Sequence, residues 1–196
     1  MDKKETTPDK GILEYAAEVD EKYSSLQEGI EEIIIETNEL ESDMVKYTEE
    51  IQNLENKPGS DVRKRANTIA RDVANVFNSY SNNVGERTEQ IEEDLNFILD
   101  GQEKIIEILD PSDPEQRETL EEQRHDLREF TNESKTAIRG ISELEQEASN
   151  IPDLSRELTK ATKELTSTLS TLISVLEEGS AKAERFVTLI DQKLDG

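Results

Sequence analysis

The sequence predicts an all-α protein, an elongated antiparallel up-down-up-down four-helix bundle with coiled-coil-like packing. Three observations support this fold class. Apolar residues recur at alternating spacings of three and four through four long segments, and short proline-containing breaks separate these segments. No segment shows the period-two alternation that is typical of a β-strand. The composition, with 36% charged and 32% apolar residues, is typical of long amphipathic helices.

The first helix is predicted over residues 8–56, and its apolar seam organises the rest of the chain. Thr7, Pro8 and Asp9 provide a capping hydroxyl, a first-turn proline and an acid near the positive end of the helix dipole. Pro58 ends the helix, which would be roughly 65 to 70 Å long. Residues 1–6 are polar and expected to be flexible, whereas 7–196 form one domain. The seam consists of Ile12, Ala16, Val19, Tyr23, Leu26, Ile30, Ile33, Thr37, Leu40, Met44, Tyr47, Ile51 and Leu54.

The second helix is predicted over residues 60–110, with Ser60 or Asp61 as its cap. Its seam begins in heptads and then shifts where Tyr80 is followed by Val84 and Arg87, a spacing that locally straightens or reverses a supercoil. The predicted inward residues are Val62, Ala66, Ile69, Val73, Val76, Tyr80, Val84, Arg87, Ile91, Leu95, Ile98, Gln102, Ile105 and Leu109.

The third and fourth helices are predicted over residues 114–150 and 153–194. Ser112 and Glu115 have the spacing of a capping box at the start of the third helix. Pro152 ends or sharply kinks that helix, and the fourth helix follows with a leucine-rich seam. Within it, the stretch 165–176 contains no charged residue, which predicts burial on more than one side or cover by a partner.

Short connections predict that consecutive helices are antiparallel neighbours. Folding the chain at its three breaks predicts which residues lie opposite one another in consecutive helices. Their numbers add to about 116 for the first and second helices, about 223 for the second and third, and about 303 for the third and fourth. This register places Gly29 and Gly85 at one level, where missing side chains would permit close approach.

The same register predicts a protruding hairpin of the first and second helices. About ten residues of each helix would extend beyond the end of the third helix, leaving an apolar strip with little cover. This strip is the candidate partner interface, although the two helices could also cover themselves or be covered by the fourth helix. Its residues are Met44, Tyr47, Ile51, Leu54, Val62, Ala66 and Ile69.

His125 is the only histidine, so it is the residue on which imidazole chemistry would depend. Glu122 and His125 form one Glu-x-x-His pair, but di-metal carboxylate bundles need a second pair, so no metal ligands are predicted. The chain has no cysteine, no glycine-rich phosphate loop and no cluster of inward acids. We therefore predict a non-enzyme with no catalytic residues and no cofactor.

The residues from Gln123 to Arg128 resemble the phosphoacceptor box of histidine-kinase dimerisation domains, in which a solvent-facing histidine is followed by an acid, a leucine and a basic residue. The resemblance would make His125 the phosphoacceptor, with Asp126 polarising the imidazole. Glu129 and Phe130 stand where the family has Thr-Pro or Asn-Pro, and no ATP-binding glycine-rich boxes follow. A passive phosphotransfer protein is therefore an alternative, whereas an autokinase is excluded.

The chain is strongly acidic, with a formal net charge of −24. This charge repels nucleic acid and anionic lipid and favours a basic partner surface. No run of residues is long and apolar enough for a membrane span, and the charged start lacks the features of a signal peptide, so we expect a cytoplasmic protein.

These features predict a non-catalytic helical module for protein–protein interaction or scaffolding, which acts through coiled-coil-like packing. Its partner would be another protein or a second copy of the same chain. A second alternative, besides histidine phosphotransfer, is an acidic inhibitor that mimics nucleic acid and binds a basic protein. The sequence alone identifies neither the partner nor the oligomeric state. It is equally compatible with a bundle formed by one chain and with a bundle in which two chains exchange hairpins.

Overall fold

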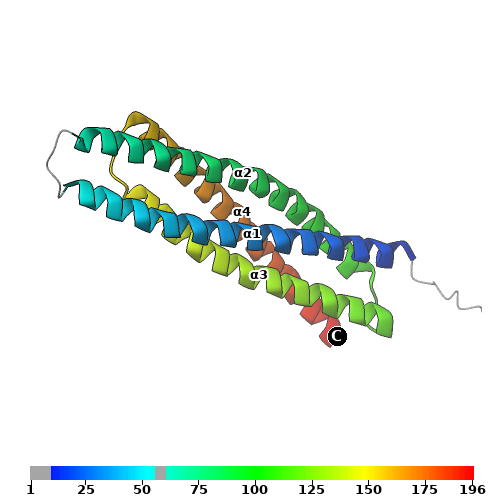
Figure 1. Cartoon of the computed structure of the whole chain (residues 1–196). Helices are drawn as coiled ribbons and strands as arrows, with labels where there is room; N and C mark the ends of the chain where they lie inside the picture. The colour runs from blue at the N-terminus through cyan, green and yellow to red at the C-terminus, as the bar shows by residue number, and fades with distance from the viewer. Residues whose placement is uncertain (1–9, 56–60) are drawn as a thin grey trace, which may run out of the picture.

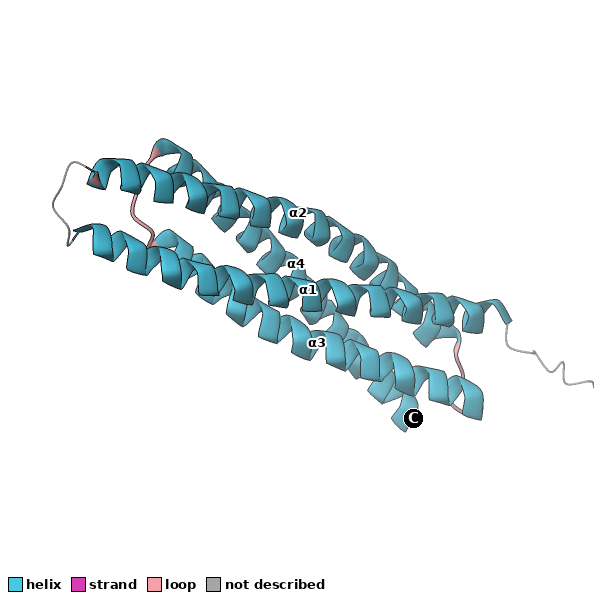
Figure 2. Ribbon diagram, in the orientation of Figure 1, coloured by secondary structure: helices cyan, strands magenta, loops and turns pink. Residues whose placement is uncertain are grey.

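The computed structural model describes residues 10–55 and 61–196, which form four long α-helices and no strand (Figure 1, Figure 2). The helices are α1 (Lys10–Glu55), α2 (Val62–Ile108), α3 (Pro114–Ser149) and α4 (Arg156–Asp195). The all-α four-helix bundle is therefore confirmed, while the predicted helix ends at residues 8, 56 and 60 lie outside the described residues. The predicted flexible segment 1–6 and the capping residue Thr7 lie outside the described residues.

The helices form a square in which α1 packs on α2 and α3, and α4 packs on the same two helices. Along the described residues, α2 and α3 do not pack side by side, so the prediction that they are neighbours is wrong. The connection Leu109–Asp113 can cross the diagonal because five extended residues reach about 17 Å. Neighbouring helix axes are only about 8 to 10 Å apart, so the diagonal of the square lies within that reach.

Hydrogen bonds fix how the helices are aligned along their axes. Between α1 and α2, Thr37 contacts Tyr80 and Lys22 contacts Asp94, which agrees with the predicted register. Between α3 and α4, the Nζ atom of Lys135 lies 2.8 Å from Glu184 Oε1, so at this contact α4 is displaced by about four helical turns from its predicted position. Residues 150–155 connect the end of α3 to the start of α4 at the same end of the bundle (Figure 2).

The core follows the predicted seams along most of the bundle, and Arg87 of α2 is a clear departure. Arg87 was predicted to point inward, but it is half-buried and binds Glu32 and Glu36 of α1, while Thr88 is buried in its place. Thr88 can occupy the core because its hydroxyl donates to the carbonyl of Val84, at 2.6 Å, so no polar group is left without a partner.

The predicted close approach at Gly29 and Gly85 is also wrong. A Cβ atom at Gly85 would meet no described atom within 4 Å, and one at Gly29 would make ordinary contact with α2. The tight positions are Gly101, where a Cβ atom would lie 2.9 Å from Val19 Cγ2, and Gly179, where it would lie 2.9 Å from Leu95 Cδ1. At these two levels, a missing side chain lets the neighbouring helix approach.

The start of α3 uses a different cap from the one predicted, whereas Ser60, a predicted cap of α2, lies outside the described residues. The Asp113 side chain, not Ser112, caps α3 by accepting from the backbone N–H groups of Glu115 and Gln116. Asp113 is extended because it precedes a proline, which is the backbone conformation that a cap requires. Ser155 caps α4 through the N–H of Leu158, whereas Asp61 makes no side-chain cap bond to the described start of α2. Along residues 10–55 and 61–196, no helix has both the length and the apolar character needed to cross a membrane.

Candidate partner-binding groove

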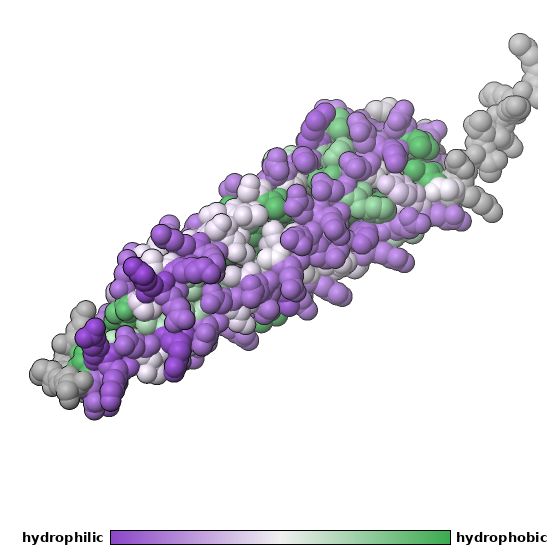
Figure 3. Space-filling view, turned by 90° about the horizontal axis from the view of Figure 1, so that it is seen from above, coloured by the Kyte–Doolittle hydropathy of each residue, from purple (hydrophilic) through white to green (hydrophobic). Residues whose placement is uncertain are grey.

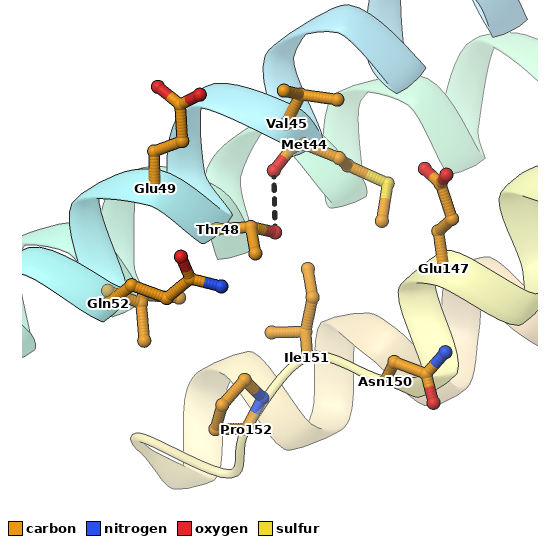
Figure 4. A pocket seen from close by; sticks show the side chains of 10 residues that line it. Met44, Val45, Thr48, Glu49, Gln52, Glu147, Asn150, Ile151 and Pro152 are labelled. Atoms are coloured by element: carbon orange, nitrogen blue, oxygen red, sulfur yellow. Dashed lines mark hydrogen bonds between the residues drawn. The ribbon is translucent and has the colours of Figure 1, made fainter.

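A groove with a volume of about 560 Å³ lies near the tip, defined as the end of the bundle where α1 and α2 extend past α3 (Figure 4). One wall comes from α1 and the other from the end of α3 and the residues that follow it. The lining residues are Met44, Val45, Thr48, Glu49, Ile51, Gln52, Glu147, Asn150, Ile151 and Pro152.

The local sequence explains why the groove forms here. The helix α3 ends at Ser149, and the N–H groups of Asn150 and Ile151 bond to the carbonyls of Glu147 and Ala148 in a last tight turn. Ile151 then points toward α1, with Met44 and Gln52 on either side of it (Figure 4). The chain leaves α3 at Pro152 and does not return along α1, so this part of α1 has a neighbour on one side only.

The predicted partner interface is only partly accessible. Met44 and Ile51 are buried, with 2% and 7% of their surface exposed. The remaining members are half-buried, namely Tyr47, Leu54, Val62, Ala66 and Ile69. Their role as an interface stays a prediction. Val45, which the sequence reasoning did not single out, is 52% exposed at the rim of the groove because it lies next to the seam and not on it.

A second groove, of about 410 Å³, lies at the same tip between α1 and α2. It contains Leu54 and Ile69 from the predicted interface together with Glu50, Lys64 and Arg65. Among the described side chains, neither basic residue forms an ion pair with Glu50. The tip thus combines apolar side chains with charges of both signs.

Acidic side chains dominate the electrostatics of the first groove. Burial, with Glu41 and Glu143 nearby, raises the pKa of Glu147 above its usual value. Burial also raises the pKa of Tyr47, and Asp43 adds to this effect. Because neighbouring acids disfavour further negative charge, a bound cationic side chain would relieve repulsion at this site.

The predicted phosphoacceptor lies far from the tip, in the first half of α3. His125 is 68% exposed, and its Nε2 atom lies 3.5 Å from Glu129 Oε1, one turn further along the helix. Asp126 is half-buried, and burial raises the pKa of its carboxyl while the adjacent His125 lowers it. The phosphotransfer role stays a prediction. Within the described part of the chain, no group of three or more His, Cys, Asp or Glu side chains could hold a metal ion.

Two buried polar clusters were not found from the sequence. In the first, Gln102 of α2 donates to Gln123 of α3 across the core, and Gln123 donates to Asp20 of α1. In the second, Asp94 is 1% exposed and accepts from Lys22, at 2.7 Å, and from Ser25, at 2.9 Å. Asp94 could not be recognised because an acid between seam positions on a long helix is normally solvated.

Comparison of the chain with protein-family models, curated proteins and solved structures found no match.

Proposed function

We propose that the chain is a non-catalytic helical interaction or scaffold module that binds a partner helix at the tip of the bundle. In this proposal the bundle is an up-down-up-down, coiled-coil-like rod in the cytoplasm, and the protruding hairpin of α1 and α2 presents the binding surface. The observation that carries the proposal is the groove beside Ile151 and Pro152, where α1 lacks the cover that α3 gives it elsewhere.

The groove favours a partner helix with an apolar stripe flanked by basic residues. Val45 and Ile151 offer apolar surface above the buried Met44 and Ile51, which suits leucine-like anchors spaced by three and four residues. Glu49 and Glu147 lie at its edges and suit lysine or arginine. The net charge of −24 would speed the approach of such a partner at low salt.

The proposal can be tested with a synthetic amphipathic helical peptide made of leucine and lysine, and with its leucine–glutamate counterpart. Binding to the full chain is measured by fluorescence anisotropy at several salt concentrations. The variant Val45→Lys removes an exposed aliphatic side chain at the groove and adds a positive charge. Ile35→Lys is the matched control, because Ile35 is 57% exposed on the same helix and does not line the groove.

The leucine–lysine peptide should bind more tightly than its acidic counterpart, and Val45→Lys should weaken its binding about five- to tenfold more than Ile35→Lys does. Equal losses in the two variants would mean that the peptide binds the acidic faces in general. That result, or equal binding of the two peptides, would overturn the assignment of the groove.

A further inference from the structure

A polar cluster lies between α1 and α3, in the half of the bundle away from the tip. Asp20 of α1 accepts a hydrogen bond from Gln123 of α3, and Gln27 donates to Glu129 at 3.4 Å. Residue numbers therefore rise together along the two helices at this level. Between these two contacts, a tyrosine of α1 lies beside an acid of α3. The cluster is called the Tyr23 site and consists of Asp20, Tyr23 and Asp126.

The hydroxyl of Tyr23 is a buried polar group that points to a ligand. Only 3% of Tyr23 is exposed, and its Oη atom makes no hydrogen bond within the described chain. Burial and the negative charges of Asp126 and Asp20 raise the pKa of Tyr23, so its hydroxyl lies close to both carboxyls and stays protonated at neutral pH. A buried polar group without a partner lowers the stability of the fold, and a bound group that pairs with it would remove this cost.

The two carboxyls of the Tyr23 site form no ion pair with a lysine or arginine of the described residues. The bases next to them in the sequence bind elsewhere, because Lys22 pairs with an acid of α2, and Arg124 and Arg128 pair with an acid of α4. Both carboxyls are half-buried, and burial raises the pKa of each. His125 lowers the pKa of Asp126, but its imidazole is exposed and contacts a glutamate one turn further along α3. A cation that enters between α1 and α3 would therefore meet two carboxylates that no lysine or arginine neutralises.

We propose that the Tyr23 site binds a primary alkylammonium group, supplied by a free amine or by a lysine side chain of a partner protein. Such a group carries one positive charge and three N–H donors. Two donors suit the carboxylates of Asp20 and Asp126, and the third suits the hydroxyl oxygen of Tyr23. Gln123 donates to Oδ1 of Asp20 and leaves Oδ2 as an acceptor.

The set of acceptors favours a primary ammonium over other cations. A guanidinium holds its donors in a flat fork that matches one carboxylate, whereas the acceptors here belong to three side chains of two helices. Calcium and magnesium ions take about six or more oxygen ligands. Within residues 10–55 and 61–196, no group of three or more His, Cys, Asp or Glu side chains could hold a metal ion. A quaternary ammonium has the charge but no N–H to donate, so it would leave the Tyr23 oxygen without a partner.

Binding at the Tyr23 site differs from the attraction of cations to the surface in general. Hydrophilic side chains cover much of the face that Figure 3 shows, and the chain contains 47 acidic residues. Exposed acids attract any cation, with or without N–H donors. Tyr23 is uncharged, so removing its hydroxyl leaves this general attraction unchanged and tests the site alone.

The experiment uses the full chain and three probes of equal charge at constant ionic strength. The first, n-butylamine, carries N–H donors, and butyltrimethylammonium has the same chain with every N–H replaced by a methyl group. A capped lysine, N-acetyl-lysine amide, stands for the side chain of a partner. Binding is followed through the carboxyl ¹³C NMR signals of the protein, which report affinity and location together. Tyr23→Phe and Asp126→Asn are compared with two controls, Tyr80→Phe, which also loses a buried hydroxyl, and Glu18→Gln, which loses one exposed acid.

We expect n-butylamine to shift the signals of Asp20 and Asp126 and to bind about fivefold or more tightly than butyltrimethylammonium. Tyr23→Phe should weaken its binding about three- to tenfold and Asp126→Asn about tenfold, whereas each control should stay within about twofold of the wild type. A capped lysine that binds as tightly as n-butylamine assigns the site to a lysine of a partner, and one that binds more weakly assigns it to a free amine.

The proposal is overturned if the two carboxyl signals do not shift, if butyltrimethylammonium binds as tightly as n-butylamine, or if Tyr23→Phe binds n-butylamine like the wild type. Helix content by circular dichroism confirms that each variant is folded. Asp20 and Met44 lie about 36 Å apart along α1, so peptide binding at the tip is scored separately.

Discussion

Replacing Asp20 with Asn should make the protein more stable at neutral pH and flatten its dependence on pH. Asp20 accepts a hydrogen bond from Gln123, which in turn accepts one from Gln102, and both glutamines are fully buried. The pKa of Asp20 is raised from 3.8 to about 6, mainly by burial and then by the negative charge of Asp126, with a smaller contribution from Glu122, while the bond from Gln123 lowers it. An asparagine keeps the carbonyl oxygen that accepts from Gln123 and carries no charge.

The sign follows from comparing the proton affinities of the folded and unfolded chains. The folded carboxyl holds its proton up to about pH 6, whereas the unfolded one loses it near pH 3.8, so folding becomes less favourable as pH rises through this window. The full difference corresponds to about 3 kcal/mol, and we reduce it to about 1 to 2 kcal/mol because Asp20 is only half-buried. This penalty is absent below about pH 4 and complete above about pH 7.

The measurement is urea unfolding monitored by circular dichroism between about pH 4 and pH 8, at constant salt. Glu18→Gln is the matched control, because it removes one exposed acid from the same helix. We expect Asp20→Asn to gain about 1 to 2 kcal/mol over the control at neutral pH and nothing at about pH 4. The reasoning fails if the two variants show the same pH dependence, or if Asp20→Asn is less stable than the wild type at neutral pH.

Three further predictions concern packing, a buried hydrogen bond and a helix cap, each measured by thermal or urea unfolding. Gly179→Ala should destabilise the fold by about 1 to 3 kcal/mol, because the new Cβ atom would lie 2.9 Å from a leucine of α2. The control Gly85→Ala should stabilise the fold by up to about 1 kcal/mol, because its Cβ atom would meet no described atom within 4 Å. Equal effects of the two substitutions would contradict the packing argument. Tyr80→Phe should lower the free energy of unfolding by about 1 to 2 kcal/mol, because it breaks the buried 2.6 Å hydrogen bond to Thr37. Thr37→Val should cost less in the Tyr80→Phe variant than in the wild type, because the bond is already lost there. Strictly additive effects would argue against a paired interaction. Ser155→Ala should cost about 1 kcal/mol through loss of the α4 cap, and an unchanged midpoint would show that the cap does not contribute.

The sequence predicted the helices well because heptad spacing and proline breaks are local properties. Positions such as Val19, Leu26 and Ile98 lie on an unbroken seam, and all three are fully buried in the structure. The prediction failed where two neighbouring positions compete for the core. Spacing alone favoured Arg87, but the smaller Thr88 is buried, because the cost of burying a guanidinium exceeds that of burying a hydroxyl bonded to its own backbone.

The arrangement of the helices was less predictable than their bounds. The connection of five residues does not by itself choose between an adjacent and a diagonal helix, since its reach allows both. The path of residues 150–155 depends on where α4 finds apolar surface on α2, a long-range contact that leaves no local signal. For the same reason, the apolar strip near Met44 could be predicted, but the groove beside Ile151 could not.

The ends of the described chain have a practical consequence for measuring distances. Lys10, where α1 begins, and Asp195, where α4 ends, lie at the same end of the bundle, opposite the tip (Figure 1). The 47 residues of α2 span about 70 Å between these ends. A dye attached at Lys10 or Asp195 would therefore lie at a fixed distance from a ligand bound at the tip. The efficiency of energy transfer from a donor at the C-terminus to a labelled peptide would then report how far from that end the peptide binds.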